Sequence, residues 1–322
     1  MDIRITRSRK VYGDGKHNAF TSIAAMQGRV FIAFRSATNH MAMDGTIKVI
    51  ASTDMEEWQV AAEARRTGVD LRDPKVAAFG GKLMVFSGGR LGTGKSMQSF
   101  LSQSADGVTF GEPVPLHGMD GRFVWGMRPR GEKLYGAAYE DEVVSLYASD
   151  DGLAWERISD FPVPGNEAYL DFDQDGILWA LVREDERGCI PALCTAEPPY
   201  TRFRSVMRLP MRLQGPMIKR LDGGCVIVCR QWELPRRNLR TDLFWLEDGH
   251  DIRRITTLPS GGDTSYAGWL DTGPGRAVIS YYSSHEHKMD EAHADDSLFA
   301  QDSAHAEHSA AADIFLADVS YG

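Results

Sequence analysis

The sequence lacks any long apolar run. No stretch of its 322 residues approaches the roughly 20 consecutive apolar residues that a membrane-spanning helix needs. Its first residues, Met1-Asp2-Ile3-Arg4-Ile5, also lack the apolar segment of a signal peptide. We therefore expect a cytoplasmic protein with no membrane partner.

Cysteine is scarce as well. The four cysteines, Cys189, Cys194, Cys225 and Cys229, are too few for a disulfide scaffold, and their spacings match no four-ligand zinc pattern. We expect buried thiols, because free cysteine behaves as a small hydrophobe. We expect neither a metal nor a cofactor.

The sequence also lacks an excess of positive charge. Its 36 Lys and Arg residues face 45 Asp and Glu residues, which gives a formal net charge of -9. Binding to a nucleic-acid backbone needs a dominant cationic surface, so we do not expect a nucleic-acid partner. Helical periodicity is nearly absent, and an apolar fraction of 43% is enough for a sizeable core.

What the sequence does contain is one pattern repeated six times. Each copy has a small or polar start, an apolar run, a turn with glycine and a second apolar run. The copies are Phe20 to Arg35, Pro74 to Arg90, Val124 to Glu140, Glu167 to Arg183, Gly215 to Arg230 and Ser265 to Tyr282. Each turn carries the Gly or Asp-Gly residues of a tight antiparallel reversal, so each copy predicts a hairpin.

A short Ser/Asp motif with an aromatic residue follows three of the hairpins. The motifs are Ser52-Thr53-Asp54 with Trp58, Ser104-Ala105-Asp106-Gly107 with Phe110, and Ser149-Asp150-Asp151-Gly152 with Trp155. We interpret them as shortened Asp-boxes, turns in which Ser and Asp side chains bond the local backbone. Their role is structural.

A spacing of about 50 residues per copy is typical of four short strands per propeller blade. The sequence therefore predicts an all-β protein, a single six-bladed β-propeller over residues 1–322. Residues Ile3 to Tyr12 have no hairpin of their own and are expected to close the ring by pairing with Asp313 to Val319. A polar loop at 286–312, rich in Ala, Asp, His and Ser, is expected as an insert in the last blade.

The residues just before each hairpin are expected to converge at one rim of the central channel. They are His17, Asn18, Arg72, Asp73, Arg122, Trp125, Asn166, Glu167, Gln214, Asp263 and Tyr266. The second strand of each hairpin is expected to run away from that rim. The second strands end in Arg35, Arg90, Glu140, Arg183, Arg230 and Tyr281. Guanidinium groups suit carboxylates, but these arginines can equally brace neighbouring blades, and both interpretations stay open for Arg35 and Arg90.

Two segments in these positions resemble the sialidase superfamily, whose Asp-box propellers share this hairpin arrangement over nearly the whole chain. Gly165-Asn166-Glu167-Ala168, followed by Leu181-Val182-Arg183, is similar to the segment with the glutamate that activates the nucleophile and one arginine of a carboxylate-binding triad. Ser265-Tyr266-Ala267-Gly268-Trp269-Leu270 resembles the segment with the tyrosine nucleophile. The resemblance assigns these roles to Glu167, Arg183 and Tyr266.

Further segments extend the resemblance. Arg236-Arg237-Asn238-Leu239 is similar to the segment of another triad arginine, whereas His17-Asn18-Ala19-Phe20 stands where the family has the arginine of its Phe/Tyr-Arg-Ile-Pro motif. Arg35 or Arg72 is a candidate to replace that arginine. Segments around Arg35 and His40, at Asp70 to Lys75, at Gly261 to Tyr266 and at Ser280 to Glu286 also resemble a bacterial sialidase-like glycosyl hydrolase group.

The resemblance implies a retaining glycoside hydrolase for an acidic sugar. Tyr266 is the implied nucleophile and Glu167 its base, while Asp44, His40 or Asp73 protonates the leaving oxygen. The predicted substrate-binding residues are Arg35, Arg72, Arg183, Arg230, Arg236, His17, Trp125, Asp263, Tyr281 and His285. Trp125, Trp232 and Tyr281 are candidates to stack on sugar rings, or to pack between blades.

Two other functions remain open. One is a propeller polysaccharide lyase, in which a Tyr/His pair takes a proton next to a uronate carboxylate and arginines neutralise that carboxylate; His40, His285 and Tyr266 supply the residue types. The other is a carbohydrate-binding propeller without catalysis, because a fold does not determine a function.

Overall fold

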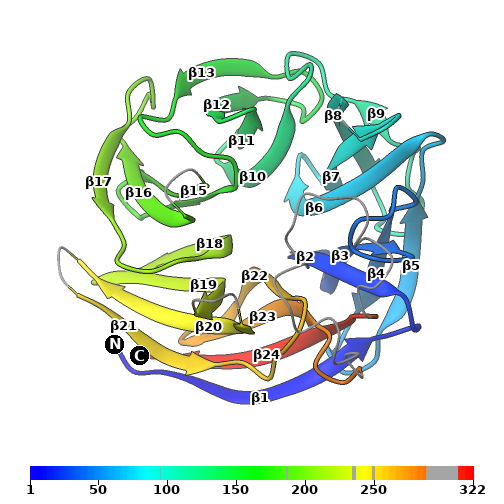
Figure 1. The fold of residues 1–322 in the computed structure, drawn as a ribbon. Coiled ribbons are helices and arrows are strands. Elements are labelled where there is room, and N and C mark those ends of the chain that lie inside the picture. Colours follow the sequence, from blue (N-terminus) through cyan, green and yellow to red (C-terminus); the bar gives the residue numbers. More distant parts are fainter. Residues whose placement is uncertain (95, 186–187, 234–236, 249–250, 288–310) are drawn as a thin grey trace.

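Six four-stranded antiparallel sheets are arranged in a ring around a central axis (Figure 1). The computed structural model describes residues 1–94, 96–185, 188–233, 237–248, 251–287 and 311–322. The sheets are the blades of a six-bladed β-propeller, so the predicted fold class is confirmed. The described residues include no helix that is long and apolar enough to cross a membrane.

Each of the first five blades takes its four strands in chain order. Blade one has β2 (His17–Met26), β3 (Arg29–Ala37), β4 (Thr46–Ser52) and β5 (Gln59–Ala64). Blade two has β6 (Val69–Phe79), β7 (Lys82–Leu91), β8 (Ser96–Ser104) and β9 (Val114–Pro115). Blade three has β10 (Phe123–Arg130), β11 (Lys133–Glu140), β12 (Val143–Ser149) and β13 (Glu156–Asp160).

Blade four has β14 (Ala168–Phe172), β15 (Leu178–Glu184), β16 (Ile190–Ala196) and β17 (Arg204–Arg208). Blade five has β18 (Gln214–Leu221), β19 (Gly224–Glu233), β20 (Arg237–Glu247) and β21 (Ile252–Thr257). The first two strands of each blade are the predicted hairpins.

Both ends of the chain build the sixth blade. β22 (Thr264–Gly273) and β23 (Arg276–Ser283) form its hairpin, β24 (Asp313–Tyr321) is the third strand and β1 (Ile3–Tyr12) is the outer fourth strand (Figure 1). β1 pairs with β24 from Ile3 opposite Tyr321 to Tyr12 opposite Ile314, which confirms the predicted closure. The expected insert at 286–312 falls largely outside the described residues and stays a prediction.

The expectation that second strands run away from the rim is wrong. Antiparallel pairing returns each second strand to the rim where the first one started, because its last residues lie opposite the first residues of its partner. Asp70 lies opposite Arg90, and Gln214 lies opposite Arg230. The inner strand starts and the second strand ends therefore form one set of residues around the axis.

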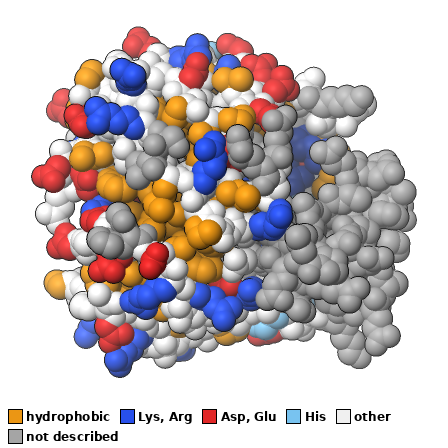
Figure 2. Space-filling view, turned by 60° about the vertical axis from the view of Figure 1, so that its left-hand side comes forward, with side chains coloured by type: hydrophobic (Ala, Val, Ile, Leu, Met, Phe, Trp, Pro, Cys, Tyr) orange, Lys and Arg blue, Asp and Glu red, His pale blue; other side chains and the backbone are white. Residues whose placement is uncertain are grey.

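Hydrophobic clusters between neighbouring blades hold the ring together. One cluster joins Phe31 and Val49 of blade one to Leu71, Val85 and Phe100 of blade two. All five side chains are at most 2% exposed, and burying one such side chain contributes roughly 1.5–3 kcal/mol. Seen from the side of blades four and five, the described surface mixes acidic and basic side chains with apolar ones (Figure 2).

The Ser/Asp motifs are hydrogen-bonded turns between third and fourth strands. In blade three, Asp151 Oδ1 accepts hydrogen bonds from the backbone N–H groups of Leu153 and Ala154 at 2.8 and 2.9 Å. Ser149 Oγ accepts one from Gly152 N at 2.8 Å, and Trp155 Nε1 donates to Gly152 O at 2.9 Å. The motif thus satisfies the backbone of a tight turn.

We expect Asp151→Ala to lower the free energy of unfolding by about 1–3 kcal/mol, because it removes the acceptor of two backbone N–H groups. Asp150→Ala is the matched control, since the exposed neighbour Asp150 bonds only to the Lys133 side chain and should change stability by less than about 0.5 kcal/mol. Urea unfolding of both variants checks this, and equal midpoints would contradict it.

Candidate functional site at the inner strand starts

Bulges at the starts of five inner strands shape the candidate site. The register shifts at Ala19/Ser22, Arg72/Lys75, Val124/Gly126, Gln214/Met217 and Ser265/Gly268. Within these bulges Phe20, Asp73, Gly215 and Tyr266 have positive φ values of 62°, 48°, 55° and 52°. A bulge reorients side chains at the edge of a sheet, and such strained backbone clusters at functional sites.

Tyr266 and Glu167 are in direct contact. The Tyr266 hydroxyl donates a hydrogen bond to Glu167 Oε1 at 2.8 Å, and Arg183 Nη1 lies 2.8 Å from the same oxygen. Glu167 Oε2 accepts the backbone N–H of Gly215 at 2.7 Å. Burial, followed by the charge of Glu167, raises the pKa of Tyr266 well above its ordinary value. The phenol is therefore protonated at neutral pH and has a carboxylate positioned to accept its proton.

Gly215 allows this contact because it has no side chain. A Cβ at Gly215 would lie 2.7 Å from Tyr266 Cδ2, and the residue has a φ of +55°. Only glycine adopts that conformation without strain while leaving room for the ring. The Gly215 bulge thus both admits the Tyr266 ring and donates to Glu167.

Arg230 holds the Tyr266 hydroxyl from the other side. Its Nη2 donates to Tyr266 Oη at 3.3 Å, while Nη1 donates to Asp263 Oδ1 at 2.8 Å and Nε donates to Gln214 Oε1 at 3.1 Å. Arg230 is 2% exposed. Tyr282 donates to Asp263 Oδ1 at 2.6 Å. These contacts give Arg230 a positioning role toward the phenol rather than an open face for a ligand.

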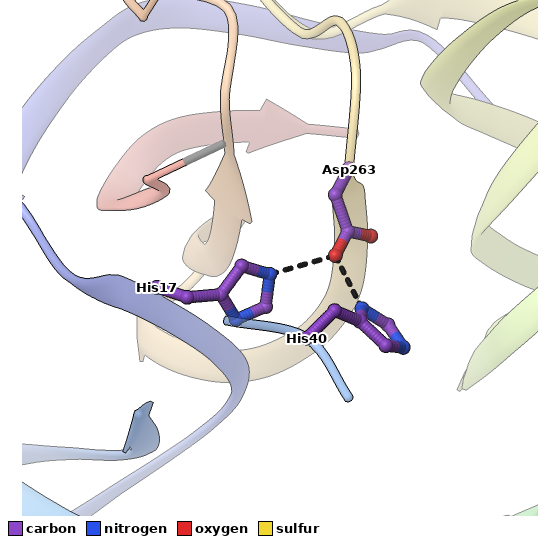
Figure 3. A group of neighbouring side chains, drawn as sticks. All are labelled: His17, His40 and Asp263. Carbon is purple, nitrogen blue, oxygen red and sulfur yellow. Dashed lines mark hydrogen bonds and ion pairs between the residues drawn. The ribbon is translucent and has the colours of Figure 1, made fainter. Parts of the chain in front are cut away.

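Two imidazoles share the second oxygen of Asp263 (Figure 3). His17 Nε2 and His40 Nδ1 lie 2.8 and 2.5 Å from Asp263 Oδ2. His17 comes from the start of β2, His40 from the loop after β3, and Asp263 from the residue before β22. Burial lowers the pKa of His17 and lowers that of His40 to about 4, so both rings are neutral at pH 7.

This group is also the candidate metal centre of the described residues, since its three ligand atoms lie within 4.8 Å of one another. Two imidazoles and a carboxylate form a donor set that binds Zn²⁺ or Fe²⁺. Here both rings bond to one carboxylate oxygen instead. Arg35 and Arg72, whose charges help to lower the pKa of His17, also oppose a divalent cation.

Blade two contributes Arg72, Asp73 and Lys75. Burial raises the pKa of Asp73, and its buried Oδ1 has no hydrogen-bond partner among the residues that the structure describes. Lys75 Nζ donates to Asp73 O at 3.0 Å and lies 4.4 Å from the centre of the Trp125 ring, while burial lowers its pKa to about 8. The Trp125 and Tyr266 ring centroids are 5.4 Å apart, which brings Trp125 to Tyr266 as well.

Arg35 braces two blades. It is fully buried, and its guanidinium donates to Asp70 Oδ1 at 3.0 Å, Asn39 O at 3.0 Å and Ala42 O at 2.6 Å. Its hydrogen bonds therefore go to the protein, which favours the bracing interpretation over the predicted substrate contact.

Three predicted residues lie apart from the Tyr266 and Glu167 contact. Asp44 is exposed, and its carboxylate accepts hydrogen bonds from Thr38. Tyr281 donates to Pro259 O and stacks on Phe315, because strand alternation turns it away from the face that Tyr282 occupies. His285 bonds to Ser283 and packs on Phe315. Arg236 and the side chain of Trp232 lie outside the described residues.

The sequence analysis missed three residues of the cluster. Tyr282, rather than Tyr281, bonds to Asp263, and Lys75 reaches Trp125. Tyr139 is half-buried, and burial followed by the charges of Asp73 and Glu167 raises its pKa. Lys75 belongs to the Asp70 to Lys75 segment that the resemblance had already singled out. Tyr139 is opposite Phe123, so a correct pairing of the third hairpin would have found it.

The comparisons with known proteins establish the fold. No protein-family model and no curated protein matches the chain. A protein of unknown function from Dyadobacter fermentans is similar over 99% of both chains, with a TM-score of 0.80 and 16% identity. A Hadza microbial sialidase is similar over 84% of this chain and 64% of its own, with a TM-score of 0.65 and 16% identity.

A Trypanosoma rangeli sialidase, solved as a covalent intermediate with 2,3-difluorosialic acid, is similar over 94% of this chain and 54% of its own. The TM-score is 0.62 and the identity 12%. This chain therefore spans about half to two thirds of the length of these sialidases. At such identities the likeness demonstrates a sialidase-like propeller fold.

The buried imidazole of His17 and the half-buried imidazole of His40 make stability depend on pH. An unfolded imidazole has a pKa of 6.5, whereas His40 in the folded protein has one of about 4. Between these pH values the unfolded chain binds more protons than the folded protein. The contribution of His40 to the free energy of unfolding is therefore fully present above about pH 6.5 and is lost as the pH decreases toward 4.

We expect His40→Gln to flatten this fall in the midpoint of thermal unfolding between pH 7.5 and pH 4.5, because glutamine cannot be protonated. His117→Gln is the control, since His117 is exposed. An unchanged pH profile in His40→Gln would show that His40 is protonated freely in the folded state.

Proposed function

We propose that the protein is a retaining glycoside hydrolase with Tyr266 as nucleophile and Glu167 as its base. The single observation that carries this proposal is the 2.8 Å hydrogen bond from the Tyr266 hydroxyl to Glu167 Oε1. A nucleophile, a base within hydrogen-bond reach and a third group that orients the base are the signature of covalent catalysis. Arg183 is that third group.

The first step forms a bond between Tyr266 Oη and the anomeric carbon and breaks the bond from that carbon to the leaving oxygen. Glu167 takes the phenolic proton and Asp73 gives a proton to the leaving oxygen. In the second step the Asp73 carboxylate takes a proton from water, the hydroxide attacks the anomeric carbon, and Tyr266 leaves with the proton from Glu167. The anomeric configuration is retained after two displacements.

Asp73 is the best proton donor of the three candidates. Burial raises its pKa, which keeps a carboxylic acid protonated closer to neutral pH, as a general acid requires. His40 has a pKa of about 4 and carries no acidic imidazolium at pH 7. Burial opposes ionisation of Asp44, but the hydrogen bonds that its carboxylate accepts from Thr38 help to lower the pKa of Asp44. Asp44 is therefore a poorer proton donor than Asp73.

The elimination mechanism has less support. It needs a histidine near the tyrosine as a partner in proton abstraction, but the Tyr266 hydroxyl contacts Glu167 and Arg230, and His285 packs on Phe315. A carbohydrate-binding propeller without catalysis has no use for a buried phenol paired with a carboxylate.

We expect Tyr266→Phe to abolish hydrolysis of 4-methylumbelliferyl glycosides, including sialic acid and uronic acid derivatives, because the attacking oxygen is gone. Tyr281→Phe is the matched control, since that hydroxyl bonds away from the site to Pro259. A fluorinated glycoside should label Tyr266 in a peptide mass spectrum. Wild-type rates in Tyr266→Phe would refute the nucleophile, and unsaturated-uronate absorbance would indicate a lyase.

We expect Asp73→Asn to lower kcat/KM by about 10²–10⁴-fold for substrates with an alkyl or sugar leaving group, because their oxygen needs a proton. The loss should be much smaller for a nitrophenyl leaving group, which departs as a stable anion. Asp44→Asn is the control and should change neither rate. An equal loss for both leaving groups would remove Asp73 from the acid role.

A further inference from the structure

Charge is unevenly distributed across the candidate site. On blades four to six, the cations Arg183 and Arg230 face the anions Glu167, Asp185 and Asp263. Arg183 donates from Nε and Nη2 to Asp185 and contacts Glu167 with Nη1, and Arg230 is bonded to Asp263, Gln214 and Tyr266. Among the described residues, these two arginines are neutralised by the protein itself and leave that side of the site with an excess of one negative charge.

The opposite side, on blades one and two, has an excess of positive charge. Its cations are Arg35, Arg72, Lys75 and Arg90, and its anions are Asp70 and Asp73. Asp70 is shared between Arg35 and Arg72: Oδ1 accepts from Arg35 Nε at 3.0 Å and Oδ2 from Arg72 Nη1 at 3.3 Å. An anion placed on this side would meet a favourable field.

Among the described residues, Arg90 is the cation on this side that forms no ion pair. It is half-buried at the end of β7, directly opposite Asp70 in the register, yet among the described residues no hydrogen bond or ion pair engages its guanidinium. The guanidinium packs on the turn at Gly94, where a Cβ would lie 2.6 Å from Arg90 Nη2. Arg72 lies two residues after Asp70 on β6, on the same strand face, and so close to Arg90 in the hairpin. Burial and the charge of Arg72 lower the pKa of Arg90, while the charges of Asp70 and Asp73 oppose this change.

Arg72 has hydrogen-bond donors to spare. Among the described residues, its Nη1 donates to Asp70 Oδ2 at 3.3 Å and its Nε lies 3.9 Å from Asp73 Oδ2. Its guanidinium lies over the Phe20 ring at 5.2 Å, and Phe20 lies 4.9 Å from the Tyr266 ring. One aromatic ring therefore separates Arg72 from the nucleophile.

We propose that Arg72 and Arg90 bind an anionic substituent of the sugar, a carboxylate or a sulfate ester, on the side of the ring away from Tyr266. The substrate class is then a uronic acid or a sulfated sugar. A 2-keto-acid sugar fits less well, because its carboxylate is attached to the anomeric carbon that Tyr266 attacks. The position of the anomeric carbon rests on the proposed function, whereas the anion site rests on Arg72, Arg90 and their charge alone.

The test measures binding in Tyr266→Phe, so that it does not depend on turnover. Isothermal titration with D-glucuronate, D-glucose 6-sulfate and D-glucose compares two anionic groups with a neutral sugar. We expect either or both of the anionic sugars to bind at least about tenfold more tightly than glucose, since one charge-assisted hydrogen bond contributes that much. When Arg90→Gln is combined with Tyr266→Phe, most of this difference in affinity between the anionic sugars and glucose should disappear.

Arg276→Gln, at the exposed start of β23 on the opposite rim, is the matched control and should leave all affinities unchanged. Equal binding of glucose and both anionic sugars, or full affinity in Arg90→Gln, would overturn the anion site. Inorganic sulfate that binds as tightly as either sugar would also overturn it, because the sugar ring would then contribute nothing.

Failure of the two proposals can be told apart. Suppose that the protein hydrolyses no glycoside but prefers anionic sugars, and that Arg90→Gln removes this preference. This result would support the anion site and refute the hydrolase. Hydrolysis of neutral and uronic acid glycosides at equal kcat/KM, unchanged by Arg90→Gln, supports the hydrolase and refutes the anion site.

Discussion

The carboxylate of Asp263 is the interaction on which the candidate site depends. It accepts hydrogen bonds from Arg230 and Tyr282 on one oxygen and contacts His17 and His40 with the other. Blades one, five and six thereby meet at one buried charge. Because Arg230 in turn holds the Tyr266 hydroxyl, removing Asp263 would take an anionic partner away from a buried guanidinium beside Tyr266, a change that is strongly destabilising.

The second feature on which the site depends is irregular backbone at the start of the inner strand in several blades. Regular strands would alternate side chains between the two faces of each blade, and neighbouring blades would cover them. The bulges at Phe20, Asp73, Gly215 and Tyr266 break this alternation where the inner strands begin. A local strain on the order of 1–3 kcal/mol at each of Phe20, Asp73 and Tyr266, the non-glycine residues with positive φ, thus brings side chains from different blades together. The interblade clusters supply the stability that tolerates this strain.

Much of the fold could be predicted from the sequence because it is repetitive. Six turn motifs at a regular spacing predicted six blades, and the same pattern placed Glu167 and Tyr266 near the axis. Individual side chains were harder to place, since the alternation of a strand gives neighbouring residues opposite faces: on β23 it is Tyr282, rather than the predicted Tyr281, that faces Asp263. The bracing role of Arg35 depends on two loop carbonyl groups, and no periodicity of the sequence shows where a loop carbonyl points.

The closure of the last blade sets the order in which the molecule can be completed. Thr6 of β1 bonds to Asp318 of β24, a partner 312 residues later. At a synthesis rate of about 5–20 residues per second, the nascent β1 waits roughly 15 to 60 s for that partner. Over that interval its edge stays open to chaperones or to strands of other chains, and His17 cannot meet Asp263. The earliest segment of the chain is therefore among the last to fold.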